Sequence, residues 1–110
     1  MTAVDAVLVE LESAGFERLP SPLIVAGSIF DFDAAAKGTG YSHDLVVVAV
    51  TSHAPDRLVR LLSALNLTLD RASSRRPVTL VLLGDPLDVR TYFDLERHAR
   101  VLTISNDEPW

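Results

Sequence analysis

Two aspartates separated by one residue are the side chains of this sequence best placed to do chemistry. Asp31 and Asp33 lie in a segment with alternating apolar residues, so in an extended strand both carboxylates point to one face. Together with Asp44 they could hold Mg²⁺, which binds carboxylate oxygens, phosphate oxygens and water. Acidic faces also occur on strands that only keep an exposed edge from pairing. The pattern therefore indicates either a metal site or a solvated strand face.

A local basic cluster is the second candidate site. It consists of Arg71, Arg75 and Arg76, which follow a leucine-rich segment. Such a cluster could contact a phosphate or an acidic partner surface. It could equally be the positive charge that is common at the C-terminus of a helix, where it faces the negative end of the helix dipole.

Three polar residues follow the two most apolar segments and form a third candidate site. Thr51, Ser52 and Asp85 could line a crevice for a small ligand at the carboxyl ends of two parallel strands. The sequence contains no G-x-G-x-x-G, P-loop or G-x-S-x-G motif, which argues against nucleotide binding and serine hydrolysis. The three histidines lack metal-ligand spacing.

Composition limits the class of protein. At 110 residues, 48% of them hydrophobic, we expect one domain over residues 1–105 and a short polar tail over 106–110. A net charge of −5 argues against binding nucleic acid without a partner. The absence of cysteine excludes a disulfide framework and a thiol nucleophile, and we expect a cytoplasmic protein. Acidic residues interrupt the apolar residues of the N-terminal segment, so we do not expect this segment to be a signal peptide. The longest apolar run, 45–50, is too short to cross a membrane.

Hydrophobic periodicity predicts seven elements in the order α-β-β-α-β-α-β. They span residues 2–14, 23–34, 45–51, 55–71, 78–83, 87–98 and 101–104. Residues 16–22 predict a connector because two prolines stop the first helix from continuing. Residues 37–40, Lys-Gly-Thr-Gly, predict the turn of a hairpin.

The order of these elements predicts the topology. The first two strands form an antiparallel hairpin, and strand 45–51, apolar on both faces, is central. The strand, helix and strand that follow imply a right-handed crossover and a parallel pair. The fold class is therefore α/β (α+β), a single domain in which helices pack on a mixed sheet.

This arrangement, with acidic residues on the hairpin, resembles the core of restriction-endonuclease-like proteins, the PD-(D/E)xK superfamily, over residues 2–83. The resemblance implies that an Asp on the hairpin and a Glu-x-Lys on the next strand hold Mg²⁺ and orient the attacking water, assisted by a Glu on the first helix. By position, Asp31 or Asp33 corresponds to the hairpin Asp, and Glu10 or Glu12 to the helix Glu.

The sequence departs from this pattern at the Glu-x-Lys, where it reads Ala49-Val50-Thr51. Ala49 cannot bind a metal, and Thr51 cannot supply the ammonium group. The resemblance therefore implies a degenerate, inactive relative without a cofactor.

We expect a non-catalytic interaction or scaffold domain that binds a protein partner or forms a homodimer. Its expected setting is a small subunit of a bacterial DNA-processing or antiphage defence system. One alternative is a divergent Mg²⁺-dependent nuclease that uses Asp31, Asp33 and Asp44, with Glu10 as a further metal ligand. A second alternative is a regulatory domain that binds a small ligand.

Overall fold

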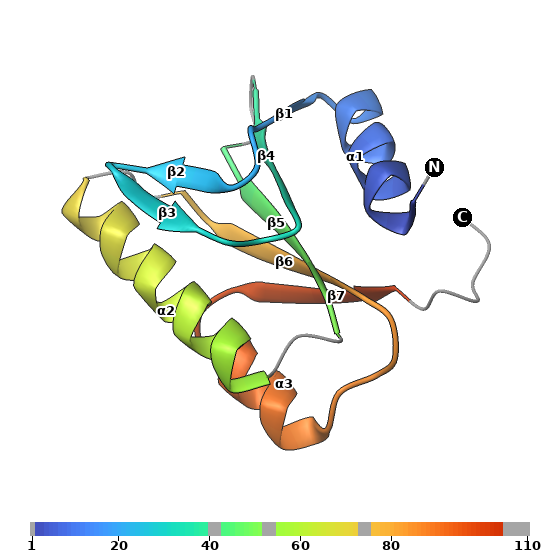
Figure 1. Ribbon diagram of the computed structural model, residues 1–110, viewed down its shortest axis with the longest axis vertical. Helices are drawn as coiled ribbons and strands as arrows, with labels where there is room; N and C mark the ends of the chain where they lie inside the picture. The colour runs from blue at the N-terminus through green and yellow to red at the C-terminus, as the bar shows by residue number, and fades with distance from the viewer. Residues whose placement is uncertain (1, 40–42, 52–54, 73–75, 105–110) are drawn as a thin grey trace.

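A five-stranded mixed sheet with helices on both faces forms the body of the molecule, and a two-stranded hairpin lies beside it (Figure 1). The structure is a computed structural model that describes residues 2–39, 43–51, 55–72 and 76–104. The predicted tail, 106–110, falls outside these residues. Helix α1 packs on one face of the sheet, whereas α2 and α3 cover the other (Figure 1).

The first helix, α1, spans Ala3–Ser13, within a residue of its predicted bounds. Thr2 is its N-cap and forms a capping box with Asp5, which satisfies backbone N–H groups that a helix start leaves unpaired. The helix ends at Ser13, and Gly15 follows its C-cap residue with a φ of +95°, which suits a residue without a Cβ atom.

The second helix, α2, spans Pro55–Arg71, as predicted. Its leucine stripe faces the sheet and is buried at four positions: Leu58, Leu62, Leu65 and Leu69. The third helix, α3 (Val89–Glu96), is shorter than the predicted 87–98, because Asp88 caps its start. No helix in the described part of the chain is long and apolar enough to span a membrane.

The sheet has the strand order β1-β4-β5-β6-β7. These strands are β1 (Phe16–Arg18), β4 (Ala34–Gly38), β5 (Leu45–Val50), β6 (Val78–Leu83) and β7 (Arg100–Ile104). The predicted topology of the centre is confirmed, since β4 and β5 are antiparallel, and β5 and β6, on either side of α2 in sequence, are parallel. Strand β7 adds to β6 in parallel and forms one edge.

Alternate residues of β5 enter two separate apolar clusters. Leu45, Val47 and Ala49 pack in the cluster under α2, whereas Val46 and Val48 pack in the cluster under α1. A strand covered on both faces needs apolar side chains at every position, which explains its unbroken run of aliphatic residues.

The single strand predicted over residues 23–34 is wrong. Strands β2 (Leu23–Val25) and β3 (Ser28–Phe30) pair antiparallel as the separate hairpin, and β4 begins only at Ala34. The chain reverses at Ala26 and Gly27, with φ values of +49° and +84°. Two consecutive positive φ angles are typical of a tight hairpin turn, and an alanine at the first position hid that turn in the sequence.

Two further predictions are corrected at the other edge of the sheet. The predicted connector 16–22 contains the edge strand β1, which pairs antiparallel with β4. Lys37 and Gly38, predicted in a turn, are the last residues of β4, where Gly38 lies opposite Phe16. A strand of three residues carries too few side chains to show an alternating pattern, which is why β1 was missed.

Candidate functional site

Asp33, one of the two aspartates that the resemblance offers for the hairpin position, lies beside the carboxyl end of the central strand β5. It directly precedes β4, and its backbone N–H donates to the Val48 carbonyl at 2.9 Å. Its Oδ2 atom accepts a hydrogen bond from the backbone N–H of Val50, also at 2.9 Å. The half-buried carboxylate therefore ties the start of β4 to the end of β5.

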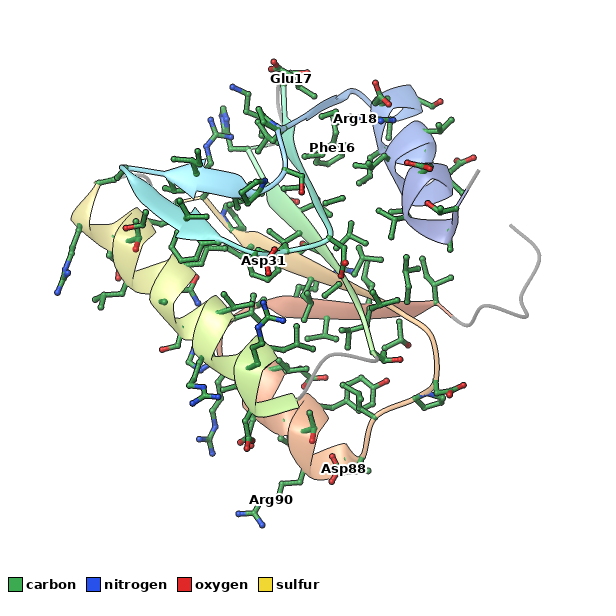
Figure 2. The ribbon with its side chains drawn as sticks, in the orientation of Figure 1. Phe16, Glu17, Arg18, Asp31, Asp88 and Arg90 are labelled. Carbon is green, nitrogen blue, oxygen red and sulfur yellow. The ribbon has the colours of Figure 1, made fainter. Side chains whose placement is uncertain are left out.

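Asp31 is held by a different partner. Its Oδ2 atom lies 2.6 Å from Nη2 of Arg57, in the first turns of α2, and its side chain is 73% exposed. Figure 2 shows Asp31 on the segment that leads from the β2–β3 hairpin toward β4. An exposed ion pair of this kind contributes little to stability, about 0–1 kcal/mol. Asp31 and Asp33 were predicted on one strand face, but residues 31–33 form no strand and the two carboxylates bind different groups.

Asp44 is at the opposite end of β5 from Asp33. It directly precedes Leu45, and its carbonyl accepts a hydrogen bond from the Gly38 N–H at 2.8 Å. The six residues of β5 separate the two ends by roughly 20 Å. The structure therefore does not bring the three aspartates into one site. Across the described ranges, no three histidine, aspartate or glutamate residues are grouped so that they could hold a metal ion.

The two glutamates considered on the first helix are exposed on α1. Glu12 forms an ion pair with Arg18 of β1, with Oε1 and Nη2 separated by 2.6 Å. That pair fastens α1 to the edge of the sheet and gives Glu12 a structural partner.

The strand positions that correspond to the Glu-x-Lys motif, and the position before them, carry apolar side chains on β5. Ala49 is fully buried and faces the α2 cluster, whereas Val48 faces α1 and Val50 packs against the same α1 cluster. Neither face of this strand offers a carboxylate or an ammonium group beside Asp33.

A polar crevice lies at the carboxyl ends of β5 and β6, where the small-ligand alternative would place its site. It encloses about 440 Å³ and contains both Thr51 and Asp85. Gly84 also lines it, with a φ of +123°, and leaves no room for a Cβ atom beside the Thr51 hydroxyl. Ser52, the third residue predicted here, lies outside the described residues.

The predicted basic cluster divides in the structure. Arg71 is exposed in the last turn of α2, and Arg75 lies outside the described residues. Arg76 donates from Nη1 to the His43 carbonyl at 3.3 Å and lines an apolar groove together with Lys37. Sequence reasoning missed this groove, because its walls come from segments far apart in the chain.

Among the described residues, Asp5 and Asp88 have lowered carboxyl pKa values, and both belong to helix starts. Hydrogen bonds from the backbone N–H and the hydroxyl of Thr2 lower the pKa of Asp5. Hydrogen bonds from Thr91, first from its side chain and then from its backbone, lower the pKa of Asp88. Hydrogen bonds to an ionised carboxylate favour the charged form, so these shifts reflect capping.

Comparison with known proteins gives one informative likeness. No protein-family model matches the sequence, and no curated protein matches it significantly. Among solved structures, the chain is similar to EndoMS, in a structure of its complex with double-stranded DNA, with a TM-score of 0.61 and 15% sequence identity. The likeness covers 98% of this chain and 46% of the EndoMS chain, so this chain spans about half the length of that protein. It shows the fold, which is restriction-endonuclease-like.

Proposed function

We propose that this chain is a non-catalytic domain with a nuclease-like fold that works by binding a protein partner or a second copy of itself. Its setting in this proposal is a small subunit of a bacterial DNA-processing or defence assembly. The observation that carries the proposal is the hydrogen bond from the Val50 N–H to the carboxylate of Asp33. In this proposal Asp33, one of the two candidates for the hairpin Asp, holds the backbone of β5.

The surroundings of Asp33 support this proposal. A magnesium site uses one or two carboxylates with substrate phosphates, and phosphate cleavage also needs a group that activates water or stabilises charge. The neighbouring positions on β5 are Val48, Ala49 and Val50, which supply neither. Asp31 is engaged with Arg57, and Asp44 is at the far end of the strand.

The outer edge of β7 supports association. Side chains on one face of this strand include Leu102, which is 45% exposed and lies opposite Val81 of β6. The Ile104 carbonyl accepts a hydrogen bond from the Gly84 N–H, so the backbone groups of Ile104 point toward β6. Because this direction alternates along a strand, the N–H and C=O groups of Val101 and Thr103 point outward, away from β6. Within the described residues no strand pairs with this edge of β7, and an edge with an exposed leucine is suited to antiparallel pairing with β7 of a second copy.

Light scattering during size-exclusion chromatography, over a range of concentrations, tests the association. We expect a dimer that Thr103→Pro converts to a monomer, because proline removes an outward N–H without touching the bonds to β6. Thr103→Val keeps the N–H at the same position and should remain dimeric. A wild-type chain that is monomeric at every concentration and binds no partner from its host would contradict the proposal.

The nuclease alternative gains support from the fold, since the similar protein EndoMS was solved with double-stranded DNA. It predicts cleavage of DNA with Mg²⁺ or Mn²⁺ that disappears in Asp33→Asn. Our proposal predicts that neither the wild-type chain nor the Asp33→Asn variant cleaves DNA. Metal-dependent cleavage by the wild type, lost in Asp33→Asn, would replace the proposed function with this alternative.

A further inference from the structure

An apolar groove between β2 and the C-terminal end of α2 carries positive charge at its walls. It encloses about 360 Å³, which lies within the range of small-molecule sites, roughly 300–1,000 Å³. We define it as the hairpin groove, whose lining includes Leu23, Ile24, Lys37, Leu45, Leu69 and Arg76. These residues come from β2, β4, β5, α2 and the segment before β6.

Apolar side chains make up most of the hairpin groove. Leu23, Leu45 and Leu69 are almost completely buried and belong to the core cluster under α2. Ile24, on β2, is 62% exposed and forms a wall that water reaches. Covering this surface with the apolar body of a ligand would remove it from water, at about 25 cal/mol for each Å².

Two cations accompany this apolar surface. Lys37 Nζ lies 3.6 Å from Oε2 of Glu17, in an exposed and therefore weak ion pair. Arg76 donates one hydrogen bond to the His43 carbonyl, and within the described ranges it forms no ion pair. A guanidinium group has five N–H donors, so Arg76 retains donors for an anion. The chain as a whole has a net charge of −5, whereas the charged side chains of the groove lining are both cations.

We propose that the hairpin groove binds a small amphipathic carboxylate, with its apolar body against the exposed Ile24 and the half-buried Leu19 and Val25, and its carboxylate at Lys37 and Arg76. A neutral apolar molecule would leave both cations unused, and a bare anion would leave the Ile24 side chain exposed to water. Arg71, in the last turn of α2, offsets the partial negative charge of the helix end nearby. The inference is independent of the proposed partner binding.

Octanoate, at concentrations below micelle formation, is the probe, and amide chemical shifts in two-dimensional NMR are the measurement. We expect octanoate to shift the amides of residues 19, 23–26, 37, 45 and 69. 1-Octanol has the same apolar body without charge, and acetate has the charge without the body, so both should bind more weakly. The double variant Lys37→Gln/Arg76→Gln should weaken octanoate binding about ten-fold, because the loss of each exposed cation should weaken it about three-fold and the two factors multiply.

Arg90→Gln is the matched control, because it removes one exposed arginine elsewhere. Figure 2 shows Arg90 at the opposite end of the molecule from Glu17, the partner of Lys37. This variant should bind octanoate like the wild type, and the dispersion of each spectrum reports folding. Equal binding of octanoate and 1-octanol, shifts confined to other residues, or no binding would overturn the inference. Tighter binding of the blocked peptide acetyl-Leu-Asp-Leu-amide in this groove would also overturn it, by identifying a protein segment as the occupant.

Discussion

The Oδ2 atom of Asp33 lies 2.9 Å from the backbone nitrogen of Val50, at the end of the central strand. Strand β4 starts one residue later, and Ala34 is paired with Val48. The antiparallel ladder would continue by placing residue 32 opposite Val50, but β4 does not extend that far. The carboxylate of Asp33 therefore takes the place of a backbone carbonyl and satisfies an N–H group that would otherwise lose its partner.

Removal of this carboxylate should destabilise the fold. We expect Asp33→Ala to lower the free energy of unfolding by about 1–3 kcal/mol, because it leaves a backbone N–H without its charged acceptor. Asp33→Asn, which keeps a carbonyl oxygen, should cost less. Urea unfolding followed by circular dichroism measures both changes.

Asp31→Ala is the matched control for that measurement. It also removes an aspartate, but its ion pair with Arg57 is exposed, so the loss should stay below about 1 kcal/mol. An equal loss at both positions, or a larger loss at Asp31, would show that the Asp33 carboxylate does not hold the end of β5.

The leucine stripe of α2 gives a second prediction. Leu62 has no exposed surface and packs between the helix and the sheet, so Leu62→Ala should lower the free energy of unfolding by about 2–5 kcal/mol. Leu67, on the same helix, is 52% exposed, and Leu67→Ala should change it by less than about 0.5 kcal/mol. Thermal unfolding of the two variants measures the difference, and similar losses would mean that the helix is docked by another face.

These core positions belong to the part of the fold that the sequence predicts well. Helix α2 and strands β5 and β6 have strong periodic or unbroken apolar patterns, and their bounds agree with the prediction within one residue. The hairpin was missed because the apolar residues 23–26 run directly into its turn, and that turn depends on a positive φ at Ala26. A backbone angle leaves no pattern in side-chain polarity.

The candidate site was predictable only in part. The spacing of the aspartates identified Asp33, but its partner is a backbone N–H, which every residue except proline carries and which no motif reveals. The hairpin groove depends on Lys37 and Arg76, 39 positions apart in the numbering, meeting beside one hairpin. Only the fold brings such residues together.

The capping box of α1 predicts a pH dependence of stability. The pKa of Asp5 is lowered in the folded state, first by the Thr2 backbone N–H and then by the Thr2 hydroxyl. A lowered pKa adds stability that is fully present above the ordinary value of 3.8 and is lost as the pH falls through the folded-state pKa. Urea unfolding at a series of pH values should therefore show wild type and Asp5→Asn converging at low pH.

The Thr2 hydroxyl supplies only part of this effect, so Thr2→Val separates the two donors. It keeps the backbone N–H and removes the hydroxyl, and the pH dependence should shrink without disappearing. Asp88→Asn, at the start of α3, should converge with wild type in the same direction. A difference between wild type and Asp5→Asn that is constant with pH would exclude a lowered pKa at Asp5.

The close approach of Gly84 to Thr51 gives the last prediction. An alanine at position 84 would combine strain at a φ of +123° with overlap between its Cβ atom and the Thr51 hydroxyl. We expect Gly84→Ala to lower the free energy of unfolding by about 3 kcal/mol or more, against about 1–2 kcal/mol for Gly15→Ala, where φ is also positive but the space is open. Adding Thr51→Ala should recover the part of the loss that comes from overlap. Adding Thr51→Val should recover none, because a methyl group replaces the hydroxyl in the same space. Recovery by both second substitutions would mean that the hydroxyl's polarity, and not its volume, sets the cost at position 84.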